Sequence, residues 1–209
     1  MKAHTPSREE KIDHCSEKQN FPKAKLPKQR PIYVVQLHNA RSLHYDFRLE
    51  VNGALVSFAV PKGPSLNPLH KRLAIRTPDH ALSYALFEGI IPEGKYGAGG
   101  VMVWDVGTFH PLKTRDGKPI SPEKSLDDGL FEFFVEGQKL YGAFALIRLD
   151  KTPHNQWLLV KMKDEFVNRN SDSIKLHKRS VLTGRTLKQI ESCNDKTTKN
   201  KKDRKKVTR

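Results

Sequence analysis

The chain has 209 residues, is 36% hydrophobic and carries a formal net charge of +15 at pH 7. This length predicts one domain with a sizeable core, and two cysteines are too few for a disulfide framework. No run of eighteen apolar residues exists and the first residues lack the apolar stretch of a secretory signal, so we expect a cytoplasmic protein without a membrane partner. The positive charge favours a polyanionic partner such as DNA or RNA.

Both ends of the chain are basic and polar. Residues 1–31 contain eight Lys or Arg against four Asp or Glu, without a sustained apolar period, which predicts a flexible basic N-terminal arm. Residues 191–209 contain eight against three, which predicts a disordered Lys-rich tail. Such termini either contact a polyanion or only keep the protein solvated, and composition does not separate the two. The folded domain is expected to span residues 32–190.

Between these ends, short segments rich in β-branched and aromatic residues alternate with Gly, Pro, Asn and Asp, which is typical of strands. The expected strands are Ile32–Leu37, Leu43–Val51, Ala54–Val60, Leu73–Arg76, Val101–Phe109, Gly129–Val135, Leu140–Leu149 and Trp157–Lys163. Their spacing predicts a mainly β fold, a closed or nearly closed β-barrel or a sandwich. Few short helices are expected, at Asp164–Asn168 and after Thr186.

The dipeptide Asn52-Gly53 separates the second and third expected strands. It is preferred in type I′ two-residue hairpins, in which both central residues take positive φ. The resulting register places Phe47 opposite Phe58 on one face and Arg48 opposite Ser57 on the other. The small residues on the second face leave room for a ligand, although a simple water-exposed face has the same pattern.

His44, Asp46 and Arg48 occupy alternate positions of Leu43–Val51, whose odd positions are apolar. Their side chains therefore emerge on one face, about 6–7 Å apart. His44 and Asp46 can converge on one cation, and His38, across a four-residue connection, can supply a third ligand. Two imidazoles and a carboxylate suit Mn²⁺, Fe²⁺ or Zn²⁺ better than Mg²⁺ or Ca²⁺. The alternative is a solvated strand face without a metal.

Arg48 favours a phosphate ligand beside that metal, because its planar guanidinium donates a fork of hydrogen bonds. The loops that follow contain further basic or protic candidates, each of which also has an ordinary structural interpretation. These candidates are Lys62, Arg72, His80 and Tyr84.

The segment Gly89–Tyr96 almost matches the phosphate-binding loop of nucleotide hydrolases. Tyr96, however, replaces the Ser or Thr that would hold Mg²⁺, and Gly97–Gly100 follows in place of the helix that would cradle phosphate. We therefore reject nucleotide binding and interpret this glycine cluster as a tight turn or a wall of the site.

The chain resembles a known family, the 3′-phosphoesterase domains of bacterial DNA ligase D, here expected as a free-standing protein. The resemblance extends over roughly residues 32–190. The segments that carry it are Val34–Gln36 with His38, Leu43–Glu50, Ala59–Ser65, Lys71–Ala74, Asp79-His80 with Tyr84, Phe87–Gly89, Ile91–Gly94, Tyr96–Gly99, Val103–Asp105, Trp157–Lys161 and Ser180–Leu187. So many specific motifs in one chain make coincidence implausible.

The resemblance implies a β-barrel enzyme that heals DNA 3′ ends in non-homologous end joining, removing a 3′-phosphate to leave a 3′-OH for repair synthesis or ligation. The implied metal is Mn²⁺, with Zn²⁺ or Co²⁺ as alternatives. By motif position, the implied metal ligands are His38, His44 and Asp46. The implied catalytic residues are Arg48, His80 and Tyr84, supported by Gln36, Lys62 and Arg72.

The resemblance also implies removal of a 3′-terminal ribonucleoside from a primer strand before the phosphate. In the family, an N-terminal Arg-Asp-Phe element followed by Thr-Pro-Glu-Pro assists that step, whereas this chain has only Thr5–Glu10. Removal of the 3′-phosphate is therefore the expected activity, and the ribonucleoside step stays open. The sequence contains no ligase or polymerase module, so separate ligase and polymerase proteins are expected to act in trans on the same primer-template ends, in association with the nucleoid.

In the expected mechanism the metal neutralises a phosphate oxygen, while Arg48 and His80 stabilise the charge on the phosphoryl group. A protonated His80 is expected to protonate the leaving oxygen. Two other functions stay open. One is a non-haem Fe(II) oxygenase, in which His44, Asp46 and a distant histidine such as His80 imitate a facial triad. The other is a non-catalytic nucleic-acid-binding barrel whose aromatic residues stack on bases.

Overall fold

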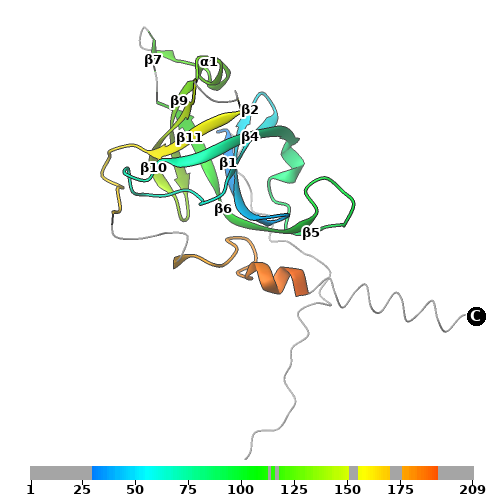
Figure 1. Ribbon diagram of the computed structural model, residues 1–209. Coiled ribbons are helices and arrows are strands. Elements are labelled where there is room, and N and C mark those ends of the chain that lie inside the picture. The colour runs from blue at the N-terminus through cyan, green and yellow to red at the C-terminus, as the bar shows by residue number, and fades with distance from the viewer. Residues whose placement is uncertain (1–29, 113, 116–117, 151–154, 170–175, 193–209) are drawn as a thin grey trace, which may run out of the picture.

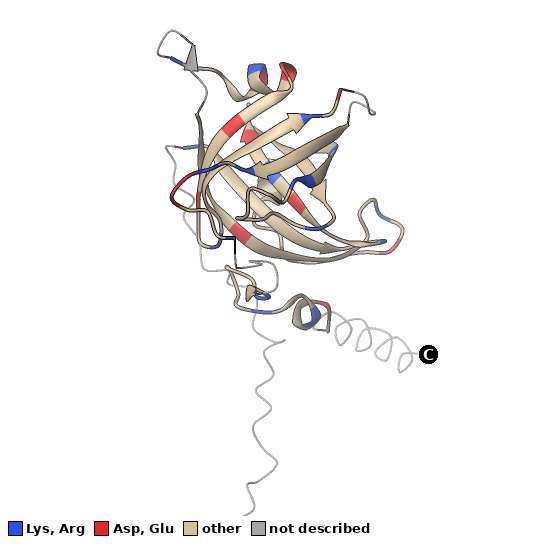
Figure 2. Cartoon of the chain, turned by 60° about the vertical axis from the view of Figure 1, so that its left-hand side comes forward, with Lys and Arg blue, Asp and Glu red and all other residues tan. Residues whose placement is uncertain are grey.

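The computed structural model describes residues 30–112, 114–115, 118–150, 155–169 and 176–192. Nearly all of the predicted arm, and the predicted tail beyond residue 192, lie outside this part of the chain. Figures 1 and 2 show a barrel of strands with a short helix, α1, beyond one end and the segment after residue 176 beyond the other.

The main sheet has nine strands, and within the described residues eight antiparallel strands close into the predicted barrel. Their order is β1, β2, β3, β4, β11, β10, β9 and β6, and pairing between β1 and β6 closes the ring. The ninth strand, β5, pairs with the start of β6, while β7 and β8 form a separate ribbon. The strand bounds are β1 (Ile32–Asn39), β2 (Leu43–Val51), β3 (Ala54–Val60), β4 (Arg72–Ala81), β5 (Gly89–Ile91), β6 (Gly99–Pro111), β7 (Thr114–Arg115), β8 (Lys118–Pro119), β9 (Leu130–Gly137), β10 (Tyr141–Arg148) and β11 (Gln156–Lys161).

The predicted hairpin between β2 and β3 is confirmed in bounds and register. Asn52 and Gly53 both take positive φ, at 51° and 77°, and Arg48 lies opposite Ser57. The strand predicted to end at Arg76 instead continues to Ala81, and this places His80 within β4. The register with β3 shifts at this point, and such a bulge accommodates Pro78, which lacks an N–H for the ladder.

The helices differ from the prediction in two places. The turn at residues 164–168 is not a helix, because the carboxylate of Asp164 accepts the N–H groups of Phe166 and Ala143 at 2.9 and 2.6 Å. The sequence prediction missed helix α1 (Pro122–Asp127), which Ser121 caps by accepting the Lys124 N–H. The predicted helix after Thr186 is confirmed over the described residues 187–192.

Two apolar clusters lie on opposite faces of the barrel wall. The larger one fills the interior and includes the fully buried Phe47, Phe58 and Trp104. The smaller one lies outside the wall, where apolar residues of β1, β3 and β6 pack under residues 82–86 and 181–182. Residues 82–88, which begin with the 3-10 helix η1 (Leu82–Tyr84), are here called the covering segment. This segment shields part of the outer face from water.

Candidate metal and phosphate site

The predicted polar face of β2 lies on the outside of the barrel, beside matching residues of β1. In the β1–β2 register, His38 lies opposite His44 and Gln36 lies opposite Asp46. The face is not solvated, since Asp46 and Arg48 are only 5% and 3% exposed. A row of charged and polar side chains therefore lies in a partly desolvated environment, where electrostatic interactions are strong.

His38, His44 and Asp46 form a group that can hold a metal ion. One ligand atom from each lies within 4.8 Å of the others. The cross-strand position of His38 places its ring 4.9 Å from that of His44. The two-imidazole, one-carboxylate set predicted from the sequence is therefore assembled around one point.

The hydrogen bonds of the two imidazoles direct their lone pairs toward Asp46. Nε2 of His38 lies 2.8 Å from the carbonyl oxygen of Gly97, and Nδ1 of His44 lies 2.9 Å from that of Ser42. A carbonyl only accepts, so these nitrogens carry the protons. The opposite nitrogens, Nδ1 of His38 and Nε2 of His44, face the Asp46 oxygens at 3.2 and 3.4 Å. The lone pair of each imidazole nitrogen then faces a lone pair of a carboxylate oxygen, and a cation or added protons must lie between them.

The pKa shifts describe the metal-free arrangement, in which added protons lie between these atoms. Burial alone raises the pKa of Asp46, but hydrogen bonds from His38 and His44 and the charge of Arg48 together hold it well below its usual range. The pKa of His44 is raised, mainly by its hydrogen bond to Asp46. Asp46 is therefore ionised at neutral pH, as a metal ligand must be. Backbone carbonyls that orient ligating histidines are a common feature of metal sites.

Arg48 connects the metal group to the rest of the face. Its Nη2 donates to Asp46 at 3.0 Å and its Nε to Gln36 at 2.8 Å. Its Nη1 donates to Ser57 at 2.7 Å and to Nδ1 of His80 at 2.8 Å. A guanidinium has five N–H groups, and these four hydrogen bonds leave one N–H of Nη2 without a partner among the described residues. That donor is available to an anion.

His80 and Tyr84 lie beside Arg48, as the sequence analysis expected. The Tyr84 ring lies 5.4 Å from the guanidinium carbon and 5.3 Å from the His80 ring. Burial and the neighbouring Arg48 lower the pKa of His80, so its imidazole is neutral rather than protonated as expected. Since Nδ1 accepts from Arg48, the proton lies on Nε2. Burial raises the pKa of Tyr84, which keeps its hydroxyl protonated.

Gln36 also belongs to this network, whereas Lys62 and Arg72 lie apart from it. The Gln36 amide donates to the carbonyl oxygens of Tyr84 and Phe87 at 3.1 and 3.2 Å, which fastens the covering segment to β1. Lys62 is exposed in the turn after β3 and has no hydrogen bond or ion pair among the described residues. A guanidinium nitrogen of Arg72 lies 3.4 Å from Nδ1 of His70. Arg72 and Ala74 share one face of β4, and Ala74 packs in the core, so the Arg72 side chain does not lie on the outer face with the site.

Three groups of this site were not predicted from the sequence. Ser57 was interpreted as a small residue that leaves space, but its hydroxyl orients Arg48 and lies 3.3 Å from His80. The carbonyls of Ser42 and Gly97 carry no side-chain signal. Gly97 has φ of +73°, and a Cβ there would lie 3.4 Å from the His38 ring, so glycine suits this wall of the site. The glycine cluster thus contains tight turns and also lines the site, so both interpretations agree with the structure.

The facial triad with His80 as its distant histidine is not assembled. His38, not His80, completes the group with His44 and Asp46. Nδ1 of His80 accepts a hydrogen bond from Arg48 instead. The group is still a set of two histidines and one carboxylate, so its donor types do not separate an oxygenase from a phosphoesterase, whereas the buried Arg48 beside it favours a phosphate ligand.

An antiparallel barrel with a metal-binding group beside a buried arginine fork defines a class of proteins suited to phosphate ester chemistry. The comparison with protein families agrees with this class: residues 36–148 match the family described as the DNA Ligase D 3′-phosphoesterase domain. The chain belongs to this family.

The curated relatives are much longer proteins. The chain is 48% identical over 158 residues to the multifunctional non-homologous end joining protein LigD of Pseudomonas aeruginosa. The matched region covers 74% of this chain and 18% of that protein. It is 42% identical over 146 residues to the multifunctional non-homologous end joining DNA repair protein LigD of Mycobacterium tuberculosis, covering 67% of this chain and 18% of the relative. The chain thus spans about a fifth of the length of these relatives. In the described part of the chain, no helix is long and apolar enough to cross a membrane.

Proposed function

We propose that this protein removes the 3′-phosphate from DNA ends in a metal-dependent reaction and leaves a 3′-OH for repair synthesis or ligation. The observation that carries the proposal is the juxtaposition of the lone pairs of His38, His44 and Asp46 with the free N–H of Arg48. A cation and a phosphate oxygen would fill the two halves of this site. Membership in the 3′-phosphoesterase family supports the same reaction.

His38, His44 and Asp46 would hold the metal, and their donor set fits Mn²⁺, with Zn²⁺ and Co²⁺ as alternatives. When bound, such an ion polarises a phosphoryl oxygen and lowers the pKa of a coordinated water. Asp46 also holds Arg48 at 3.0 Å, so the ligand that neutralises the metal orients the guanidinium as well. The two positive groups therefore act on the same phosphate.

The remaining residues would stabilise and orient the phosphoryl group. Arg48 would donate a hydrogen bond from its free Nη2–H to an equatorial oxygen, where charge increases in the transition state. His80 donates from Nε2 as a neutral imidazole. Tyr84, whose hydroxyl stays protonated, supplies a further donor from the covering segment. Gln36 would act through Arg48 and the covering segment, while Lys62 would contact the substrate strand from the exposed turn after β3. Arg72 is not included in the proposed site, because its side chain lies on the core face of β4.

The proposed substrate is a DNA primer-template end, which accords with the net charge of +15. The proposed organisation is a catalytic barrel of residues 32–190 between a basic arm and a Lys-rich tail. Residues 191–192 continue the helix, so the tail would begin at residue 193. Ligase and polymerase proteins of end joining would use the 3′-OH that results.

The test is a labelled primer-template that ends either in a 3′-phosphate or in a single 3′-ribonucleotide. The wild type is incubated with Mn²⁺, Zn²⁺, Co²⁺ or Mg²⁺ and with EDTA, and the 3′-phosphate and 3′-OH products are resolved. We expect conversion of 3′-phosphate to 3′-OH that requires metal, is lost in His44→Ala and is retained in His110→Ala, a histidine outside the site. Absence of product with every metal, or equal product in EDTA, would contradict the proposal. The ribonucleotide substrate reports separately on the ribonucleoside step.

A further inference from the structure

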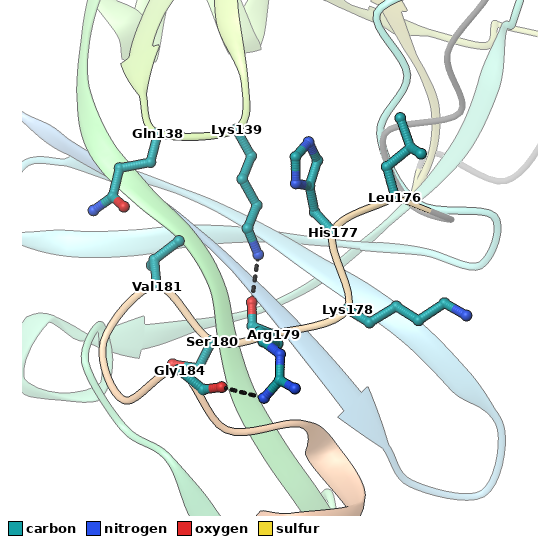
Figure 3. Close-up of a pocket in the computed structure, with 9 residues that line it drawn as sticks. All are labelled: Gln138, Lys139, Leu176, His177, Lys178, Arg179, Ser180, Val181 and Gly184. Atoms are coloured by element: carbon teal, nitrogen blue, oxygen red, sulfur yellow. Dashed lines mark hydrogen bonds between the residues drawn. The ribbon is translucent and has the colours of Figure 1, made fainter.

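A second basic site lies outside the metal and phosphate site. Residues 176–184, here called the strap, form an open pocket of about 700 Å³ together with the hairpin residues Gln138 and Lys139 (Figure 3). The strap contributes His177, Lys178 and Arg179 to this pocket. None of the residues that line it carries a carboxylate.

The hairpin that carries Lys139 is held rigidly. The buried carboxylate of Asp105 accepts the backbone N–H groups of Gln138, Lys139 and Leu140 at 3.1, 3.2 and 2.9 Å. It also accepts the hydroxyl of Tyr33 at 2.6 Å. The position of Lys139 is therefore fixed before any ligand binds.

The strap is fixed to β6, the strand that also carries Asp105. Trp104 of β6 donates its indole N–H to the carbonyl of His177 at 2.5 Å, and the Lys139 ammonium lies 4.7 Å from the Trp104 ring centre. That ammonium donates to the carbonyl of Arg179 at 2.5 Å (Figure 3). Lysine, tryptophan and strap thus form one preorganised unit.

The cationic groups of the strap are unneutralised, unlike several others in the protein. Arg76 and Lys124 pair with carboxylates at 2.5 and 2.7 Å. Among the described residues, the Arg179 guanidinium donates only to the carbonyl of Gly184, at 3.0 Å, and the Lys178 side chain has no hydrogen bond or ion pair. Most of the Arg179 donors are therefore available to an anion.

The pocket lies a short distance from the metal and phosphate site. Val103 of β6 lies opposite Gln36 of β1, and its carbonyl accepts the N–H of Val181 in the strap at 3.1 Å. Neighbouring strands are about 4.8 Å apart, so the strap backbone lies roughly 10 Å from that of Gln36. One strand of a DNA duplex rises about 3.4 Å per nucleotide along the helix axis. About three nucleotides of duplex therefore span the distance between these two backbones.

We propose that the strap and Lys139 bind successive backbone phosphates of the DNA strand that leads to the 3′ end held at the metal and phosphate site. The identity of the ligand rests on the proposed function, but the site is a separate one. In Figure 3 the side chain of Lys178 extends away from Lys139, while the Arg179 guanidinium lies beside Gly184. Charges spread in this way suit the spaced phosphates of a polymer rather than one free phosphate ion.

The state of Lys139 supports this assignment. Burial lowers its pKa to about 8, while the buried carboxylates of Asp105 and Glu88 raise it in part. A phosphate beside the ammonium would favour its charged form. Binding of the backbone would thus compensate an unfavourable charge of the free protein.

The experiment measures binding of a fluorescent primer-template with a 3′-OH end by anisotropy, in EDTA, at several salt concentrations. The test variants are Lys178→Ala and the double variant K178A/R179A. The matched control, K118A/K124A, removes two charges beside α1, at the other end of the barrel (Figure 1). Thermal denaturation confirms that each variant folds, and Lys178→Ala disturbs no hydrogen bond of the described residues.

We expect the double variant to bind about tenfold more weakly at moderate salt and to reduce the slope of log Kd against log salt by about 1.8, since each phosphate contact contributes about 0.9. Lys178→Ala alone should reduce the slope by about 0.9. In turnover assays the double variant should have a higher KM than the wild type for long duplexes, with kcat unchanged. For a 3′-phosphorylated dinucleotide, both KM and kcat should equal those of the wild type. Inorganic phosphate should compete only as any salt does.

Three results would overturn the inference: unchanged binding in both test variants, an equal loss in K118A/K124A, or competition by inorganic phosphate well beyond its ionic strength. The last result would indicate a site for a free anion. The binding assay needs neither metal nor turnover. If the wild type released no phosphate from any DNA, the proposed function would fail while the strap would still be tested.

Discussion

The proposed metal ligands can be tested by thermal stability. Stability measured without metal reports on folding, and the change on adding Mn²⁺ reports on cation binding. A ligand that binds only the folded state adds RT ln(1 + [L]/Kd) to the free energy of unfolding, about 2.7 kcal/mol at 100-fold excess over Kd. For a chain of this size, 1 kcal/mol changes Tm by about 2–4 °C. Saturating Mn²⁺ should therefore raise the Tm of the wild type by roughly 5–11 °C.

Variants of the three ligands should behave differently from one another. His38→Ala and His44→Ala should lose most of the Mn²⁺-dependent rise, because each removes a lone pair from the group. Asp46→Asn should lose the rise and also be less stable without metal. It leaves Arg48, 3% exposed, without the carboxylate it contacts at 3.0 Å, and removal of one partner of a buried pair costs about 3–5 kcal/mol.

The assay is thermal denaturation by circular dichroism in EDTA and across a Mn²⁺ titration, with His110→Ala as the control. His110 stacks on Phe134 away from the group and should retain the full rise. An equal rise in His44→Ala and in the wild type would refute the assignment of the ligands. Absence of any rise in the wild type would refute the metal site itself.

Three further outcomes are expected. Arg48→Lys keeps the charge but loses the fork that joins Asp46, Gln36 and His80, so kcat for phosphate release should fall by about 100-fold or more, measured with Tm as the folding control. Tyr33→Phe removes a donor at 2.6 Å from the buried carboxylate of Asp105 and should lower the free energy of unfolding by about 1.5–3 kcal/mol in urea denaturation; no loss would contradict the role of that bond. The folded pKa of Lys139 is about 8 and its ordinary value is 10.5, so between these values the unfolded state binds more protons than the folded state. The free energy of unfolding of the wild type, relative to that of Lys139→Gln, should therefore rise with pH across this interval. Denaturation of both proteins at the two ends of the interval checks this sign, and a fall in the difference would contradict the burial of Lys139.

Local patterns in the sequence were sufficient for the strands that form the site. The alternation of Leu43–Val51 and the Asn52-Gly53 turn depend only on neighbouring residues, so they predicted the register of Arg48 opposite Ser57 correctly. They also predicted that His44, Asp46 and Arg48 share a face. The extent of β4 was underestimated, because Pro78 ends a strand unless a bulge accommodates it, and the bulge depends on pairing with β3.

The sequence by itself determined which side chains share one face of β2, because side-chain direction alternates residue by residue along a strand. Only the tertiary structure decided that this face is buried under the covering segment and that the carbonyl of Gly97 orients His38. These features depend on barrel closure between β1 and β6 and on backbone groups that every residue possesses. No local pattern of side chains encodes them.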